Sequence, residues 1–95
     1  MPLFTIIADY GGGTYLAQIQ ARSAKEAAIA WPKSPAVAEL ALLLDLPIAS
    51  FKEVLRKPEL SPVRSLSRCW CVTADLGDQL LLLHIVQSAE VERNK

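Results

Sequence analysis

The stretch RCWCVTADLGDQLLLLHIVQS, residues 68–88, predicts a β-hairpin, and the rest of the chain is built around it. Residues 69–75 form the outgoing strand and residues 80–87 the returning strand, because two strand-forming runs flank a turn at Gly77-Asp78. A loop of two residues or of four gives the same register, which sets Asp75 opposite Leu80 and Cys71 opposite His84. Both cysteines and the single histidine of the chain lie in this hairpin, so cysteine and histidine chemistry must be sought here.

This register divides the hairpin side chains between two faces. One face is expected to lie in the core and holds Trp70, Val72, Ala74, Leu81, Leu83 and Ile85. The opposite face holds Cys69, Cys71, Thr73, Asp75, Leu80, Leu82, His84 and Val86. Because Leu80, Leu82 and Val86 make the returning strand apolar on both sides, we expect the strand to be covered on both sides. These three residues therefore predict an interface.

The same opposite face brings two thiols and an imidazole together, and three kinds of chemistry follow. Cys69, Cys71 and His84 are candidate metal ligands, although C-x-C with one histidine is a far weaker pattern than paired C-x-x-C motifs. Cys71 and His84 form a candidate nucleophile–base pair, with Thr73 or Asp75 as the third group. A Cys69–Cys71 disulfide is disfavoured, because residues two apart on a strand lie about 6.6 Å apart. We expect instead that both cysteines act as small apolar residues, so no catalytic residue, metal or cofactor is predicted.

Residues 3–10 and 14–21 predict a second hairpin around Gly11-Gly12-Gly13. Pairing Tyr15 with Tyr10 or with Ala8 keeps the apolar side chains of the two strands on one face, so we expect a loop of four or two residues. The glycines are not a phosphate-binding loop, because neither P-loop nor dinucleotide-binding spacing is present and a strand follows them. A turn that needs positive φ explains the glycines better.

Three helices are expected between the hairpins. A capping box at residues 23–26 begins the first, which ends near Trp31 because Pro32 follows. Ser34-Pro35 begins the second, over residues 35–45, and a capping box at residues 50–53 begins the third, over 51–57. The second helix is apolar nearly all round, with Leu42 and Leu43 off its main stripe, which makes these two leucines a second candidate interface.

The predicted fold class is therefore α+β. Two hairpins form a four-stranded antiparallel sheet in the order β-β-α-α-α-β-β, with the helices on one face. Residues 1–95 form one domain, residues 58–68 a surface loop and residues 89–95 a frayed tail. The expected core residues are Phe4, Ile6, Ile19, Trp31, Trp70, Leu83 and Ile85.

Composition restricts the possible functions. The 95 residues are 52% hydrophobic and carry no net charge, which argues against a nucleic-acid-binding protein. Five basic residues lie in the expected third helix and the loop after it, but they fit a solvated surface better: Lys52, Arg56, Lys57, Arg64 and Arg68. The longest apolar run is too short to cross a membrane, and two cysteines without a signal-like start indicate the cytoplasm.

Two resemblances add to this interpretation. FTIIADYGGGTYLAQIQARSAKEAA, residues 4–28, resembles the glycine-turned hairpin and capped helix of HicB-type antitoxins, although the third strand and the DNA-binding segment of that family are lacking. CWCVTADLGDQLLLLHIVQS, residues 69–88, together with YGGGTY, resembles a family of small uncharacterised bacterial proteins, which implies no function or site. We expect a non-enzymatic module that forms a homodimer or binds a protein partner. The alternatives are an antitoxin-like or immunity-like protein that binds a small toxin and, third, a Cys/His site.

Overall fold

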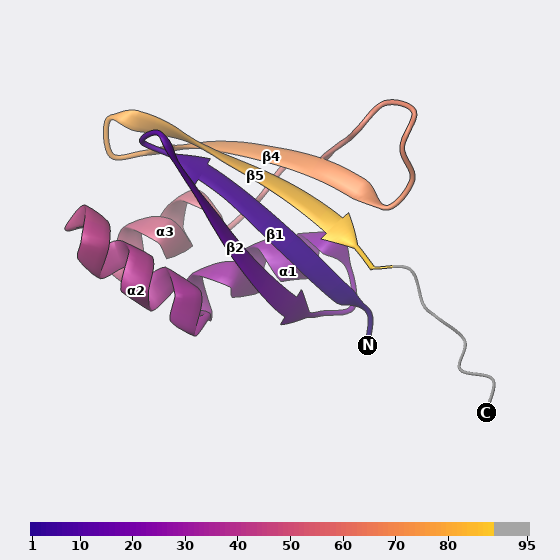
Figure 1. The fold of residues 1–95 in the computed structure, drawn as a ribbon, viewed down its shortest axis with the longest axis horizontal. Coiled ribbons are helices and arrows are strands. Elements are labelled where there is room, and N and C mark those ends of the chain that lie inside the picture. The colour runs from indigo at the N-terminus through magenta and orange to yellow at the C-terminus, as the bar shows by residue number, and fades with distance from the viewer. Residues whose placement is uncertain (89–95) are drawn as a thin grey trace.

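Five antiparallel strands form one sheet, and three helices lie on one side of it (Figure 1). The computed structural model describes residues 1–88, so the expected frayed tail at residues 89–95 lies outside the described part. The strands are β1 (Leu3–Tyr10), β2 (Gly13–Gln20), β3 (Ser61–Pro62), β4 (Cys69–Leu76) and β5 (Gln79–Gln87). The helices are α1 (Ala24–Ala30), α2 (Pro35–Leu44) and α3 (Ile48–Val54), with a 3₁₀ helix, η1 (Trp31–Lys33), between α1 and α2. The α+β class with an antiparallel sheet is confirmed.

The strand order β2-β1-β5-β4-β3 joins the two hairpins through their inner strands, β1 and β5. The prediction of four strands is one short. After α3 the chain runs back beside β4, and the Val63 N–H donates to the Cys69 carbonyl at 3.0 Å. Part of the expected surface loop thus becomes the two-residue strand β3 at the edge of the sheet.

Both hairpin registers agree with the predicted pairing of faces. In the N-terminal hairpin Ala8 pairs with Tyr15, which leaves a two-residue turn. In the C-terminal hairpin Cys71 pairs with His84. The turn glycines Gly12 and Gly77 have φ of +86° and +64°, a conformation that suits residues without a Cβ.

One core fills the space between the sheet and the helices. Trp31, directly after α1, is only 2% exposed, and its ring and that of Phe51 lie in an edge-to-face arrangement at a centroid distance of 6.0 Å. Phe4, Ile6, Leu83 and Ile85 are buried in the same cluster. Two other expected core residues are only partly buried against the cluster: Ile19, which lies on an edge strand, and Trp70, whose ring lies 6.2 Å from that of Phe4.

The helix starts follow the expected capping pattern in one case and depart from it in another. The Ser23 side chain accepts a hydrogen bond from the Glu26 N–H at 3.1 Å, as a helix N-cap does. The third helix begins at Ile48, so the predicted capping box at residues 50–53 is wrong. Pro47 caps this helix with φ of −68°, and the Ser50 N–H already donates to the Pro47 carbonyl, so Ser50 lies inside the helix.

Candidate functional site

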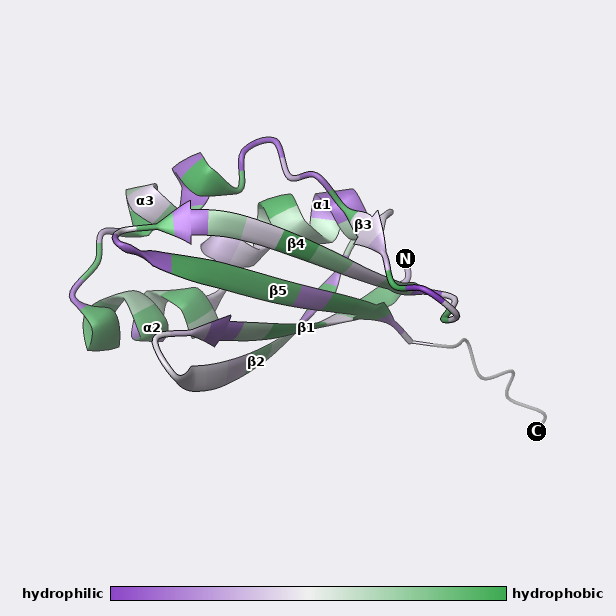
Figure 2. Cartoon of the chain, turned by 90° about the horizontal axis from the view of Figure 1, so that it is seen from above, coloured by the Kyte–Doolittle hydropathy of each residue, from purple (hydrophilic) through white to green (hydrophobic). Residues whose placement is uncertain are grey.

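None of the described helices covers the second face of the sheet, here called the open face (Figure 1). It consists of the odd-numbered residues of β1 and β4 and the even-numbered residues of β2 and β5, which alternate with the buried ones. Figure 2 shows β5 as a mostly hydrophobic strand near the middle of the sheet. The predicted interface residues of the hairpin and the Cys/His cluster all lie on this face.

The pairing of β4 with β5 sets Cys71 and His84 side by side. The Gln87 N–H donates to the Arg68 carbonyl at 2.9 Å, so these two residues form a hydrogen-bonded pair. Pair types alternate along an antiparallel ladder, which makes Cys71–His84 a pair of the non-hydrogen-bonded type. Cβ atoms of directly opposite residues lie about 4.5–5.5 Å apart, at the close end for this type. The thiol and the imidazole are therefore neighbours.

The neighbours of this pair are apolar. His84 pairs with Ile7 on its other side, and Ile7 pairs with Leu16, so a row Leu16–Ile7–His84–Cys71 crosses four strands. The nearest carboxylate of β1 belongs to Asp9, which pairs with Leu82. No carboxylate among the described residues pairs directly with His84 to orient its ring.

Metal chemistry finds no support in the same geometry. Cys69 pairs with Val86, so it lies only diagonally from His84. Within residues 1–88 no group of three His, Cys, Asp or Glu side chains is arranged to hold a metal ion. Cys69 and Cys71 are both free thiols and half-buried. The open face thus offers one thiol beside one imidazole, without a further ligand or an orienting acid.

The apolar side chains of the open face are its more extensive feature. Leu80 is 57% exposed, and Leu82 and Val86 are half-buried. Leu16, which is 65% exposed, and the half-buried Ile7 extend this surface across β2 and β1. Sequence reasoning named the three β5 residues but missed Ile7 and Leu16. The sequence did contain a signal for these two residues. Alternation places Ile7 and Leu16 on the outward side of the first hairpin, and both are apolar.

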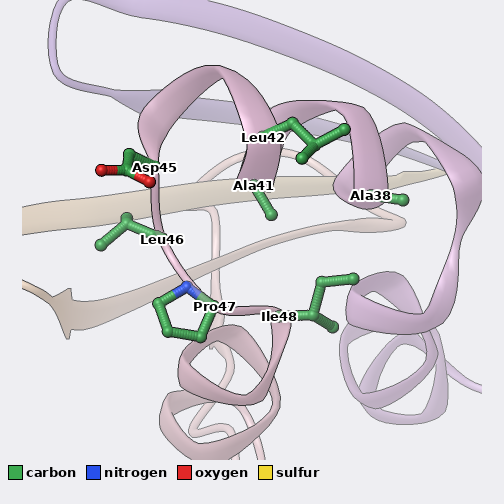
Figure 3. Close-up of a pocket in the computed structure, with 7 residues that line it drawn as sticks. All are labelled: Ala38, Ala41, Leu42, Asp45, Leu46, Pro47 and Ile48. Atoms are coloured by element: carbon green, nitrogen blue, oxygen red, sulfur yellow. The ribbon is translucent and has the colours of Figure 1, made fainter.

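The second candidate interface lies on α2. Leu42 is 84% exposed and Leu43 is 72% exposed, whereas Val37, Leu40 and Ala41 of the same helix are buried. Leu42 borders an open hollow of about 400 Å³ (Figure 3), also lined by Ala38, Ala41, Asp45, Leu46, Pro47 and Ile48. Apart from the Asp45 carboxylate its side chains are apolar, so the hollow lacks the convergent polar groups of a small-molecule site.

Two further features of residues 1–88 bear on nucleic-acid and membrane binding. Of the five candidate basic residues, Arg56 forms an ion pair with Glu53 at 3.5 Å, and both side chains are well exposed. No single described helix is long and apolar enough to span a membrane. The pair formed by residues 24–33 and 35–44 meets that length and composition only when taken together, across a bend of 57°.

Comparison with known proteins finds no family model, no curated protein and no solved structure that matches this chain. The resemblances to HicB-type antitoxins and to small bacterial proteins therefore stay predictions.

Proposed function

We propose that this protein is a non-enzymatic interaction module whose open face binds the open face of a second copy. The observation that carries the proposal is the set of exposed or half-buried apolar side chains that the open face holds on strands β1, β2 and β5. A sheet face that meets only water normally alternates to polar residues, whereas here Ile7, Leu16 and Leu82 interrupt that pattern. Packing two such faces about 10 Å apart would remove these side chains from water.

The charges of the open face favour a second copy as the occupant. Among the face residues of β1, β2, β4 and β5, only Asp9 and Asp75 carry a carboxylate, and none is a lysine or arginine. Both acids lie near the hairpin turns. The two turns lie side by side, because the Tyr10 hydroxyl donates to the Leu76 carbonyl at 2.5 Å. Two copies related by a two-fold axis, with their strands running in opposite directions, keep the acids at opposite ends of the contact. A strongly basic partner is not required.

The size of the face also fits this occupant. Strands of eight residues are about 26 Å long, and four strands are about 19 Å wide, which gives roughly 500 Å² in projection. Side-chain relief raises the accessible area above the projected area, toward the roughly 800 Å² per partner of a standard interface.

The test compares Leu82→Glu with Thr73→Glu by size-exclusion chromatography with light scattering. Leu82 is half-buried near the middle of the face, and Thr73, its exposed pair on β4, lies nearer the sheet edge. At micromolar concentration we expect Leu82→Glu to halve the molar mass of the wild type, because a carboxylate would have to be buried in the contact. Thr73→Glu is expected to keep most of the wild-type association.

Circular dichroism of both variants confirms that each chain remains folded. A wild type that runs as a single chain would overturn the proposal and leave the open face to a different protein, as the antitoxin-like alternative requires. An unchanged mass for a folded Leu82→Glu variant would also overturn it.

A further inference from the structure

Among residues 1–88, the edge of the sheet at β2 presents a row of backbone groups without a partner strand. The Ala21 N–H donates to the Pro2 carbonyl at 3.2 Å, which makes Pro2–Ala21 a hydrogen-bonded pair. By alternation, the odd-numbered residues of β2 bond to β1. The N–H and C=O groups that point away from β1 are those of Thr14, Leu16, Gln18 and Gln20.

The two edges of the sheet differ in how they resist pairing. β2 is eight residues long, GTYLAQIQ, and contains neither a charged residue nor a proline. At the opposite edge β3 has two residues, and one of them is Pro62, which has no N–H to donate. Beyond β3 this edge is formed by β4, which carries the charged residue Asp75. Edge strands that remain free usually carry lysine, proline or a bulge, or are very short. Only the β2 edge lacks these features.

Strand geometry restricts how a second β2 could pair with the first. Outward-pointing backbone groups belong to even-numbered residues, so an antiparallel pair must set even residues opposite even residues. Directly opposite residues point to the same side of the sheet, so the helices of both copies lie on one side. If Leu16 pairs with the partner copy's Leu16, Tyr15 lies opposite Ala17 on the helix side, a large side chain against a small one.

A groove beside the β2 edge adds side-chain contacts to the backbone pairing. A hollow of about 320 Å³ lies between α2 and β2, lined by Thr14, Tyr15, Leu16, Ala36, Glu39, Leu40 and Leu43. Figure 1 shows α2 on the helix side of the sheet, close to the start of β2. Leu43, exposed in the single chain, lies at this groove, so it would be partly covered when two copies join at this edge.

From these observations we infer that β2 pairs with β2 of a second copy, Leu16 opposite Leu16, to form one continuous ten-stranded antiparallel sheet. The contact uses the strand edge and the α2 groove, not the packing of two open faces, so it goes beyond the function proposed above. Each contact can be removed without the other.

Proline at an outward-pointing position tests the edge directly. In the Leu82→Glu background, which removes the face contact, we expect a dimer. Adding Gln18→Pro should halve its mass, because the proline removes an N–H that bonds only to the second copy. The matched control adds Thr73→Pro. The N–H of Thr73 also points outward, beyond the end of β3 on the opposite edge, so the dimer should persist.

The outcomes separate the two proposals. If Leu82→Glu alone is a single chain while the wild type is a dimer, the edge contact is overturned and the face contact stands. If the wild type and Leu82→Glu are both dimers and Gln18→Pro separates them, the edge contact stands and the face contact is overturned. Equal effects of Gln18→Pro and Thr73→Pro would also contradict pairing through β2.

Cross-linking tests the register and does not depend on the proline variant being folded. Leu16→Cys, in a chain with Cys69→Ser and Cys71→Ser, should form a disulfide-linked dimer on oxidation with copper phenanthroline. Opposite residues of a hydrogen-bonded pair have Cα atoms about 5.5 Å apart, within disulfide range. Thr14→Cys in the same chain is the control, because its counterpart in the second copy lies more than about 13 Å away. Equal cross-linking of the two variants would overturn the register.

Discussion

Gly77 and Gly12 have similar turn conformations but different surroundings. Both have positive φ, so an alanine at either position costs about 1–2 kcal/mol of backbone strain. A Cβ at Gly77 would lie 3.2 Å from the Tyr10 hydroxyl, whereas nothing lies within 4 Å of one at Gly12. We therefore predict that Gly77→Ala lowers the free energy of unfolding more than Gly12→Ala does, by about 0.5–1.5 kcal/mol, the usual net value of one hydrogen bond. Urea unfolding of the two variants measures the difference.

A control for this prediction uses Tyr10→Phe, which removes the hydroxyl that donates to the Leu76 carbonyl. In the Tyr10→Phe background, Gly77→Ala and Gly12→Ala should lower the free energy of unfolding equally, because the hydroxyl that a Cβ at position 77 would displace is absent. A difference that persists there would show that Tyr10 is not its cause.

Among the elements, α3 provides a direct comparison between a local sequence pattern and the structure. The capping-box pattern at residues 50–53 implies that Ser50→Ala costs about 1 kcal/mol. The structure places Ser50 inside α3, where alanine is the better helix former. We predict that Ser50→Ala changes the free energy of unfolding by less than about 0.5 kcal/mol. The control is Ser23→Ala, which removes the α1 cap bond and should lower the free energy of unfolding by about 1 kcal/mol. Thermal or urea unfolding of the two variants checks this. Equal losses for the two variants would contradict the helix start at Ile48.

The hairpins could be predicted from sequence because their information is local. Alternation of apolar residues fixes which side chains share a face, and the turn at Gly77-Asp78 then sets Cys71 opposite His84. The strand order could not be obtained in this way, because the pairing of Ile7 with His84 joins residues far apart in the chain. β3 was missed for a related reason: Ser61 and Pro62 have no strand pattern and become a strand only because β4 lies beside them.

The open face was predictable only in part. Leu80, Leu82 and Val86 stand out in sequence because their strand is apolar on both sides. Leu16 does not, because one exposed leucine is ordinary and its importance comes from neighbours on other strands. Its row with Ile7 and its place at the free edge exist only after the two hairpins have joined.

At the scale of the whole molecule, both layers depend on one core. Trp31 reports on the helix layer through its contact with Phe51, and Trp70 reports on the sheet through its contact with Phe4. The buried cluster includes residues from α1, α2, α3 and from strands β1, β4 and β5, so neither layer keeps a core without the other.

We therefore predict one cooperative unfolding transition. In urea, the loss of helix measured by far-ultraviolet circular dichroism and the change in tryptophan fluorescence should share one midpoint at a fixed chain concentration. Because self-association binds only the native state, that midpoint should rise with chain concentration in the wild type and less so in Leu82→Glu. A Trp31→Phe variant, in which Trp70 is the only tryptophan, reports on the sheet layer alone and so separates the two layers. Loss of helix at lower urea than the change in fluorescence would show that the helices unfold from the sheet independently.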